Sequence, residues 1–114
     1  MHVNTWHTDR WPAGIPREIT GYAKPLFAVL DDAAQAFPDQ TYTIFSGAAQ
    51  SFRQVQETAN RVANFLIARG IRKGDRVAIF LPNIASYPAV YFGILKAGAV
   101  CVTCNPLYTA SELN

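Results

Sequence analysis

The clearest pattern in the chain is a stripe of apolar residues with the spacing of an α-helix. Apolar side chains recur at steps of three or four, which places them on one face of a helix; they are Phe52, Val55, Ala59, Val62 and Leu66. Ser51 and Gln54 form a capping-box pattern at its start, and Gly70 is typical of a helix end. We predict an amphipathic helix over this stretch, with its striped face packed on a core.

A second helical spacing begins after Pro25, with apolar residues at Leu26, Leu30, Ala33 and Phe37. Proline suits a first helical turn, and Pro38 prevents the helix from continuing. Asp31 and Asp32 fall on the outer face of this predicted helix, where we expect solvated side chains rather than catalytic ones.

A β-hairpin is predicted between these two helices. The segment Thr41–Phe45 is rich in β-branched and aromatic residues, which favours a strand. Residues 46–49 then read as a turn, so a returning strand is expected to end near Phe52.

The last forty residues predict a strand, a helix and a second strand. Residues 76–81 are apolar on both faces, as in a parallel strand, and residues 100–104 repeat that pattern. The helix between them runs from about Ser86 or Tyr87 to Ala97, and Gly98 stops it. Gly93 inside this helix indicates close packing against a neighbour.

The fold class follows from this order of elements. We predict an α/β protein, the first part of a doubly wound parallel-sheet subdomain, preceded by an N-terminal arm, a helix and a hairpin. Two parallel strands do not make a whole sheet, so we expect an incomplete domain. Residues 1–24 form the predicted arm, which Trp11 and Ile15 should anchor by burial, and residues 25–114 form the domain portion.

Composition supports the idea of a missing partner domain. Half of the 114 residues are hydrophobic and only 16% are charged, against about 25% in a typical domain. From Val77 onward the only charged side chains are Lys96 and Glu112, and the apolar runs are too short to span a membrane. The net charge of +2 is dispersed without a basic stripe, which argues against nucleic-acid binding.

Few residues in the chain suggest chemistry. Cys101 and Cys104 have C-x-x-C spacing, but a strand would hold them on opposite faces and too far apart for a disulfide, so buried free thiols are favoured. Residues 70–74 lack a phosphate-loop pattern and read as a polar connection. No catalytic set and no metal site can be assembled, so we predict no catalytic, cofactor-binding or metal-binding residues.

Position in the sheet singles out two loops. Ligands of open parallel sheets bind outside the carboxyl ends of the strands, where residues 82–84 and residues 105–108 are expected. The asparagines in these loops, Asn83 and Asn105, either touch a ligand or cap the backbone, and geometry alone leaves both interpretations open.

Several motifs in order resemble those of AMP-forming acyl-CoA synthetases, members of the adenylate-forming superfamily. They are GIRKGDRVAIFLPN at residues 70–83, YFGILKAGAV at 91–100, and SFRQV at 51–55. The segment NPLYT at 105–109 is similar to the long-chain fatty-acid branch, as is the arm with Trp11-Pro12 and Gly14-Ile15-Pro16.

This resemblance implies a two-step ligation in a longer parent protein. A fatty acid and ATP give an acyl-adenylate and pyrophosphate, with magnesium, and coenzyme A then displaces AMP. The family's catalytic residues lie beyond Asn114, so the isolated chain should be inactive. The loop after the second strand lies near the coenzyme A route in relatives, which suggests Asn105, Leu107 and Tyr108 as substrate-binding residues.

Two alternatives stay open, one of them a fragment of an aryl-CoA ligase or a peptide-synthetase adenylation domain. The other is a non-catalytic α/β interaction module. The expected partners are the remainder of the AMP-binding domain and, in the parent, fatty acid, ATP and coenzyme A. Without a leader sequence we expect a cytoplasmic protein, and peripheral membrane contact, a homodimer or self-association of the fragment are left open.

Overall fold

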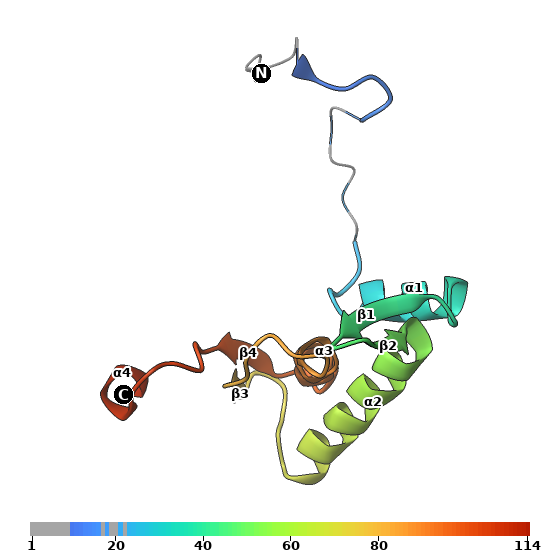
Figure 1. Cartoon of the computed structure of the whole chain (residues 1–114). Coiled ribbons are helices and arrows are strands. Elements are labelled where there is room, and N and C mark those ends of the chain that lie inside the picture. The colour runs from blue at the N-terminus through green and yellow to red at the C-terminus, as the bar shows by residue number, and fades with distance from the viewer. Residues whose placement is uncertain (1–9, 17, 19–20, 22) are drawn as a thin grey trace.

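Four helices and four short strands make up the part of the chain that the structure describes, residues 10–16, 18, 21 and 23–114 of a computed structural model. Figure 1 shows their order: α1 (Ala28–Ala36), β1 (Thr41–Phe45), β2 (Ala48–Ser51), α2 (Phe52–Ala68), β3 (Arg76–Ile79), α3 (Tyr87–Lys96), β4 (Val100–Thr103) and α4 (Ala110–Leu113). The type and sequence of these elements confirm the predicted fold. The proposed division at residue 24 stays a prediction.

Helix α2 is the best match between sequence pattern and structure. The Ser51 N–H donates to Oε1 of Gln54 at 2.9 Å, and the Gln54 N–H donates back to the Ser51 hydroxyl at 3.3 Å. This capping box satisfies backbone donors that a helix start leaves without partners. At the other end, Gly70 has a φ of 91°, a left-handed conformation that favours glycine.

The hairpin β1–β2 has a tighter turn than expected. Ser46 and Gly47, with φ of 49° and 81°, form the turn by themselves. Ala48 and Ala49, predicted as turn residues, instead pair with Phe45 and Ile44 in the antiparallel ladder. A two-residue turn with two positive φ angles matches the twist of the strands it joins, which explains why the ladder continues so close to it.

Strands β3 and β4 are parallel and joined through α3, as predicted. Arg76 pairs with Val100 and Ile79 with Thr103, so both strands run out at the same edge. Each strand ends one or two residues earlier than the apolar runs suggested. The Cys104 N–H still donates to the Ile79 carbonyl at 2.9 Å, beyond the last paired residues.

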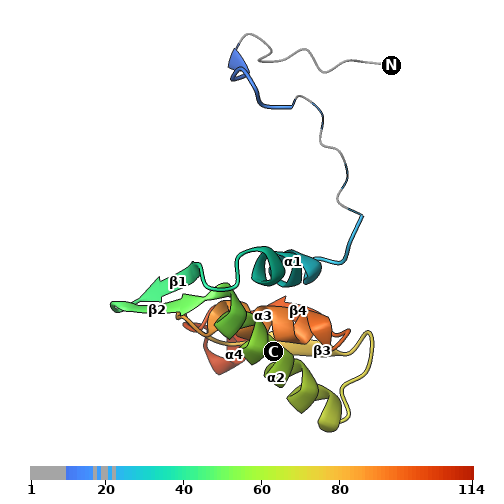
Figure 2. The same cartoon turned by 90° about the vertical axis from the view of Figure 1, so that its right-hand side faces the viewer.

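Helix α3 lies between α2 on one side and the strands β3 and β4 on the other (Figures 1 and 2). An apolar cluster fills the space on each side of it. The first cluster joins it to α1 and α2 and consists of buried Leu30, Val55, Ala59 and Ala89, with Tyr42, Phe52 and Phe92 packed around them. The second cluster joins it to β3 and β4 around buried Ile79, Ile94 and Ala99. Helix α3 is therefore apolar on two sides rather than on one.

Gly93 is what lets α2 and α3 approach each other. A Cβ atom at this position would lie 2.6 Å from Cβ of Val62 and 2.9 Å from the Ala59 carbonyl oxygen. Real Cβ atoms essentially never come so close, so only glycine fits without a shift of the helices. The close packing predicted from this helical glycine is confirmed.

The outer face of α1 is not wholly solvated, which corrects the expectation for Asp31. Its carboxylate is half-buried and accepts hydrogen bonds from Lys96 Nζ and from Gln56 Nε2. Lys96 also donates to Asn60 Oδ1 at 2.7 Å, so one cation links all three long helices. A helical wheel cannot show this, because the partners lie 25 and 65 residues further along the chain.

The arm residues Trp11 and Ile15 are not buried, contrary to prediction. They are 45% and 55% exposed, and the Trp11 indole N–H donates to the Ile15 carbonyl at 2.9 Å. The two anchors therefore close a local turn on each other. His2 and His7 lie outside the described residues. Within the described ranges, no helix has the length and apolar character needed to cross a bilayer.

Candidate functional site

The carboxyl ends of β3 and β4 place two loops side by side. Because the strands are parallel and in register, the segments after Ile79 and Thr103 leave the sheet at one edge. Ligands of open parallel sheets bind at this edge, since the loops there are free to vary while the strands hold them in position. The two loops singled out from the sequence are therefore neighbours in the same region of the fold.

The loop after β4 is a tight turn ordered by Asn105. Its Oδ1 accepts the Leu107 N–H at 3.0 Å, and its carbonyl accepts the Tyr108 N–H at 3.0 Å. The asparagine thus caps the backbone through its side-chain oxygen. Leu107 is 85% exposed and Tyr108 is 45% exposed. The turn brings all three predicted binding residues together and leaves all three exposed to solvent.

The same loop runs directly into a second capping box. The Thr109 N–H and hydroxyl both donate to Oε2 of Glu112, at 2.7 and 2.8 Å. The hydrogen bond from the Thr109 N–H holds the pKa of Glu112 below its ordinary value, and the bond from the Thr109 hydroxyl adds to this effect. The first turn of α4 is thereby fixed, which orients Tyr108 immediately before it.

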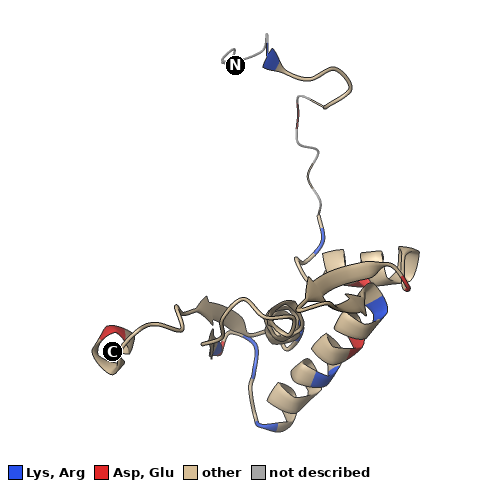
Figure 3. Ribbon diagram, in the orientation of Figure 1, with Lys and Arg blue, Asp and Glu red and all other residues tan. Residues whose placement is uncertain are grey.

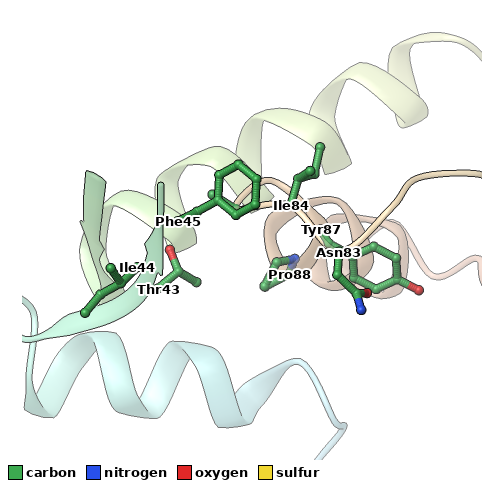
Figure 4. Close-up of a pocket in the computed structure, with 8 residues that line it drawn as sticks. Thr43, Ile44, Phe45, Asn83, Ile84, Tyr87 and Pro88 are labelled. Carbon is green, nitrogen blue, oxygen red and sulfur yellow. The ribbon is translucent and has the colours of Figure 1, made fainter. Parts of the chain in front are cut away.

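A shallow groove lies beside the other loop, between β1 and the start of α3 (Figure 4). Its volume is about 340 Å³ and it lies at the carboxyl end of β3. Its apolar walls come from both segments, and its polar groups are Thr43, Asn83 and Tyr87; the full lining is Thr43, Ile44, Phe45, Asn83, Ile84, Ala85, Tyr87 and Pro88. Asn83 therefore reaches a concave surface, whereas Asn105 orders a turn.

Sequence analysis missed the contribution of the hairpin to this groove. Ile44 and Phe45 were interpreted only as strand residues, yet they are 74% and 45% exposed and form one wall. Two consecutive large apolar residues point to opposite faces of a strand. A two-stranded hairpin cannot bury both of its faces. The adjacent apolar residues Ile44 and Phe45 therefore could have indicated, from the sequence alone, an apolar surface on the hairpin.

The two cysteines differ in their surroundings. Cys101 lies in β4 and packs against the second apolar cluster, where burial, followed by the neighbouring Cys104, raises the pKa of its thiol. Cys104 follows the strand, and its Sγ lies 4.0 Å from the Val102 carbonyl oxygen. Both thiols are free, as predicted, but they are half-buried rather than buried. The raised pKa of Cys101 disfavours the thiolate, which is the nucleophilic form.

Within residues 10–16, 18, 21 and 23–114, no three His, Cys, Asp or Glu side chains come together as they would around a metal ion. Residues 70–74 form the connection from α2 to β3, as predicted from the sequence.

Comparison with known proteins decides the family. The profile of the "AMP-binding enzyme" family matches residues 30–114, about three quarters of the chain. The chain belongs to the AMP-binding enzyme family. The match begins inside α1 and includes the hairpin, the βαβ unit and both loops of the candidate site.

Curated members of this family give consistent alignments. A long-chain-fatty-acid–CoA ligase of Bacillus subtilis is 42% identical over 103 residues, 90% of this chain and 18% of its own length. The long-chain-fatty-acid–CoA ligase of Salmonella typhimurium is 39% identical over 107 residues, 92% of this chain and 19% of its length. This AMP-binding chain therefore spans about a fifth of the relatives it matches.

Solved structures show the same fold for the AMP-binding chain. MbtA of Mycobacterium smegmatis superposes with a TM-score of 0.75 at 38% identity, over 79% of this chain and 17% of that protein. A fatty acyl CoA synthetase of Mycobacterium tuberculosis gives 0.71 at 32% identity, over 76% and 18%. The α1-to-β4 arrangement is thus the N-terminal portion of a larger architecture in these relatives.

Proposed function

We propose that this chain is the N-terminal part of a long-chain fatty-acid–CoA ligase. The parent would join a fatty acid to coenzyme A through an acyl-adenylate, with release of AMP and pyrophosphate. The observation that carries the proposal is the 42% identity to the Bacillus subtilis ligase over 90% of the chain. A triostin synthetase of Streptomyces triostinicus reaches 33% over 80%.

A second candidate is an adenylating enzyme for a different acid. Two structural neighbours favour it: MbtA, at 38% identity, and an anthranilate CoA ligase, at 30%. The fatty acyl CoA synthetase structure, at 32% identity, lies between these two values. The N-terminal part of this fold is therefore shared across acid classes, and substrate choice has to be measured.

A chimera tests the two candidates with the residues of this chain. Replacing the matching N-terminal segment of the Bacillus subtilis ligase by residues 30–114 should leave thioester formation with palmitate within about tenfold of the parent enzyme. A folded chimera that accepts benzoate or an amino acid in preference to palmitate contradicts the proposal. The isolated chain should show no ATP–pyrophosphate exchange, because the family resemblance implies catalytic residues beyond Asn114.

Within that function we propose that Asn105, Leu107 and Tyr108 bind the substrate, along the path of the coenzyme A arm. Support comes from the ordered turn, the exposed Leu107 and Tyr108 side chains and the carboxyl-edge position. ATP, magnesium and coenzyme A belong to this proposal for the parent. No step is assigned to magnesium through the residues of this chain.

Splitting the reaction into its halves tests this site. In the chimera, Tyr108→Ala should raise the KM for coenzyme A about tenfold and leave the ATP–pyrophosphate exchange rate unchanged, since exchange precedes thioester formation. Gln35→Ala, at an exposed position on α1, is the matched control. Equal loss in both half-reactions would indicate a structural role for Tyr108 instead.

The remaining parts of the proposal concern location and assembly. We place the protein in the cytoplasm with peripheral membrane contact, which suits an enzyme whose substrate dissolves in lipid. Strand β4 exposes the apolar side chains of Val100 and Val102, at 48% and 39%, so the isolated chain should self-associate through this face. A compact monomer in light scattering at tens of micromolar would contradict that expectation.

A further inference from the structure

The basic residues of the chain are concentrated in one short stretch. Five of its ten Lys and Arg residues lie between Arg61 and Arg76, where Asp75 is the only acid. This stretch therefore carries a charge of +4, and the rest of the chain carries −2. Figure 3 shows the blue segments along the C-terminal half of α2 and the loop that leads to β3. This asymmetry corrects the expectation, based on the overall charge of +2, that the charges are dispersed along the chain.

At the end of α2, charged and apolar side chains are exposed together. We call this surface the basic tip; it consists of Phe65, Ile67, Arg69, Arg72 and Lys73. Phe65 is 55% exposed and Ile67 is 53% exposed, although both occupy the last turn of a helix whose other face is buried. In Figures 1 and 2 this end of α2 lies at one extremity of the body.

The positive charges of the basic tip form no ion pair among the described residues. None of the ion pairs found among the described residues involves Arg69, Arg72 or Lys73. Asp75 is occupied by the backbone, because its Oδ2 accepts the Arg72 N–H at 2.7 Å. The charges of Arg72 and Lys73 are therefore available to an anionic partner.

The loop that carries them is held firmly. The Gly74 N–H donates to the Gly98 carbonyl at 3.0 Å, and the stem of Lys73 packs beside Gly98. The Asp75 N–H donates to the Arg72 carbonyl at 3.0 Å. The cationic side chains thus project from a backbone tied to the turn between α3 and β4.

We infer that the basic tip docks on the surface of a bilayer containing anionic phospholipids. Lys and Arg beside exposed aromatic and aliphatic side chains are the combination that binds at the interface between headgroups and acyl chains. The cations attract the negative headgroups, and Phe65 and Ile67 enter the apolar boundary. The inference rests on the peripheral membrane contact in the proposed function and assigns it a surface.

The geometry favours lipid over single-stranded RNA, which also attracts basic and aromatic residues. RNA binding uses the open face of an aromatic ring as a platform for a base. Here the Arg69 guanidinium carbon lies 4.7 Å from the centre of the Phe65 ring and covers one of its faces. The tip also lies at the amino end of β3, opposite the edge that carries Asn105 and Tyr108, so docking leaves the candidate site open.

Vesicle flotation tests the inference with the full chain. It should bind vesicles of equal parts phosphatidylcholine and phosphatidylglycerol, and it should bind pure phosphatidylcholine weakly. Raising the salt from about 50 mM to about 500 mM should release it, because the Debye length shrinks several-fold. The double variant Arg72→Gln/Lys73→Gln should bind the anionic vesicles roughly 30-fold more weakly, and Phe65→Ser roughly fivefold.

Matched controls keep the outcome interpretable. Arg10→Gln/Arg53→Gln removes the same charge from exposed positions outside the tip and should keep binding within about twofold. Circular dichroism establishes that each variant is folded. Unchanged binding by the Arg72/Lys73 variant, equal binding to both vesicle types, or binding of polyuridylate in place of vesicles would overturn the inference. Ligation of a water-soluble acid by the chimera should not change in this variant, which separates failure of docking from failure of the proposed ligase.

Discussion

The two apolar clusters beside α3 are built on one helix but are enclosed to different degrees. The first is surrounded by α1, α2 and the hairpin, and Ala59 at its centre is fully buried. The second lies between α3 and the strands β3 and β4, and the outer face of β4 exposes Val100 and Val102. The first region is complete within residues 30–92, whereas the second resembles part of a sheet.

This difference separates a region that the chain encloses by itself from one that needs a neighbour. The helices and the hairpin bury a core that joins residues as far apart as Leu30 and Ala89. The parallel pair needs further strands or helices for its second face, in agreement with a chain that spans about a fifth of its relatives. Perturbations of the enclosed region should therefore have larger effects on stability than perturbations of the open region.

The largest effect is expected at Gly93, where the enclosed region is tightest. Gly93→Ala should lower the free energy of unfolding by about 2–3 kcal/mol, because the steric cost exceeds the roughly 1 kcal/mol gained in helix propensity. Urea denaturation followed by circular dichroism measures it. The double variant Gly93→Ala/Val62→Ala should be less destabilised than the sum of its parts. A stabilised Gly93→Ala would show that α2 and α3 are not in close contact.

A smaller loss is expected when the polar link between the helices is cut. Lys96→Met should lower the free energy of unfolding by about 2 kcal/mol, because the largely buried cation donates hydrogen bonds to both Asp31 and Asn60. Lys24→Met is the control, because its ion pair with Asp32 is exposed and should contribute less than about 1 kcal/mol. Equal effects of the two substitutions in the same urea assay would contradict a special role for Lys96.

The two capping boxes offer a direct comparison between the regions. Ser51→Ala should destabilise the chain by about 1 kcal/mol, because Ser51 caps the 17-residue helix of the enclosed core. Thr109→Ala removes the equivalent residue from the exposed four-residue α4 and should leave global stability within about 0.5 kcal/mol. A larger loss from Thr109→Ala would mean that α4 takes part in the core.

The smallest effect is a pH dependence that Asp31 confers. Partial burial acts to raise its pKa, but hydrogen bonds from Lys96 and Gln56 and the Lys96 charge outweigh burial and lower it. A lowered carboxyl pKa contributes stability that is present above the unfolded value, about pH 3.9, and is lost as pH falls through the folded value. Between about pH 5 and pH 3 the wild type should therefore lose more stability than Asp31→Asn. Parallel curves for the two proteins would contradict this.

Local signals in the sequence predicted most of the fold. Contacts within a few residues determine the Ser51–Gln54 cap and the helix ends at Gly70 and Gly98. The close packing at Gly93 was predictable because a glycine inside a helix leaves room for a neighbouring helix to approach. Long-range polar contacts were not predictable, because the Asp31–Lys96 pair joins residues 65 positions apart. Trp11 and Ile15 were wrongly expected to be buried, since a turn rich in proline and glycine can close on itself.

The candidate site was predictable only in part, and for similar reasons. Parallel strands place both loops at one edge, so the positions of Asn83 and Asn105 followed from the order of elements. The groove beside Asn83 needs the hairpin as its second wall, and nothing in a loop motif indicates which distant strand will lie across from it. Whether Asn105, Leu107 and Tyr108 bind a substrate stays a prediction that the split half-reaction assay addresses.

The position of α3 between the two clusters also has a consequence for synthesis on the ribosome. Every member of the first cluster has emerged once Phe92 leaves the exit tunnel, whereas the second cluster still awaits Ala99 and Cys101. The enclosed core can therefore close first and present α3 as a preformed template on which β4 docks next to β3. Translation thus completes the β3–β4 pair only after the enclosed core. The apolar outer face of β4 is therefore exposed for a shorter time than it would be if the order were reversed.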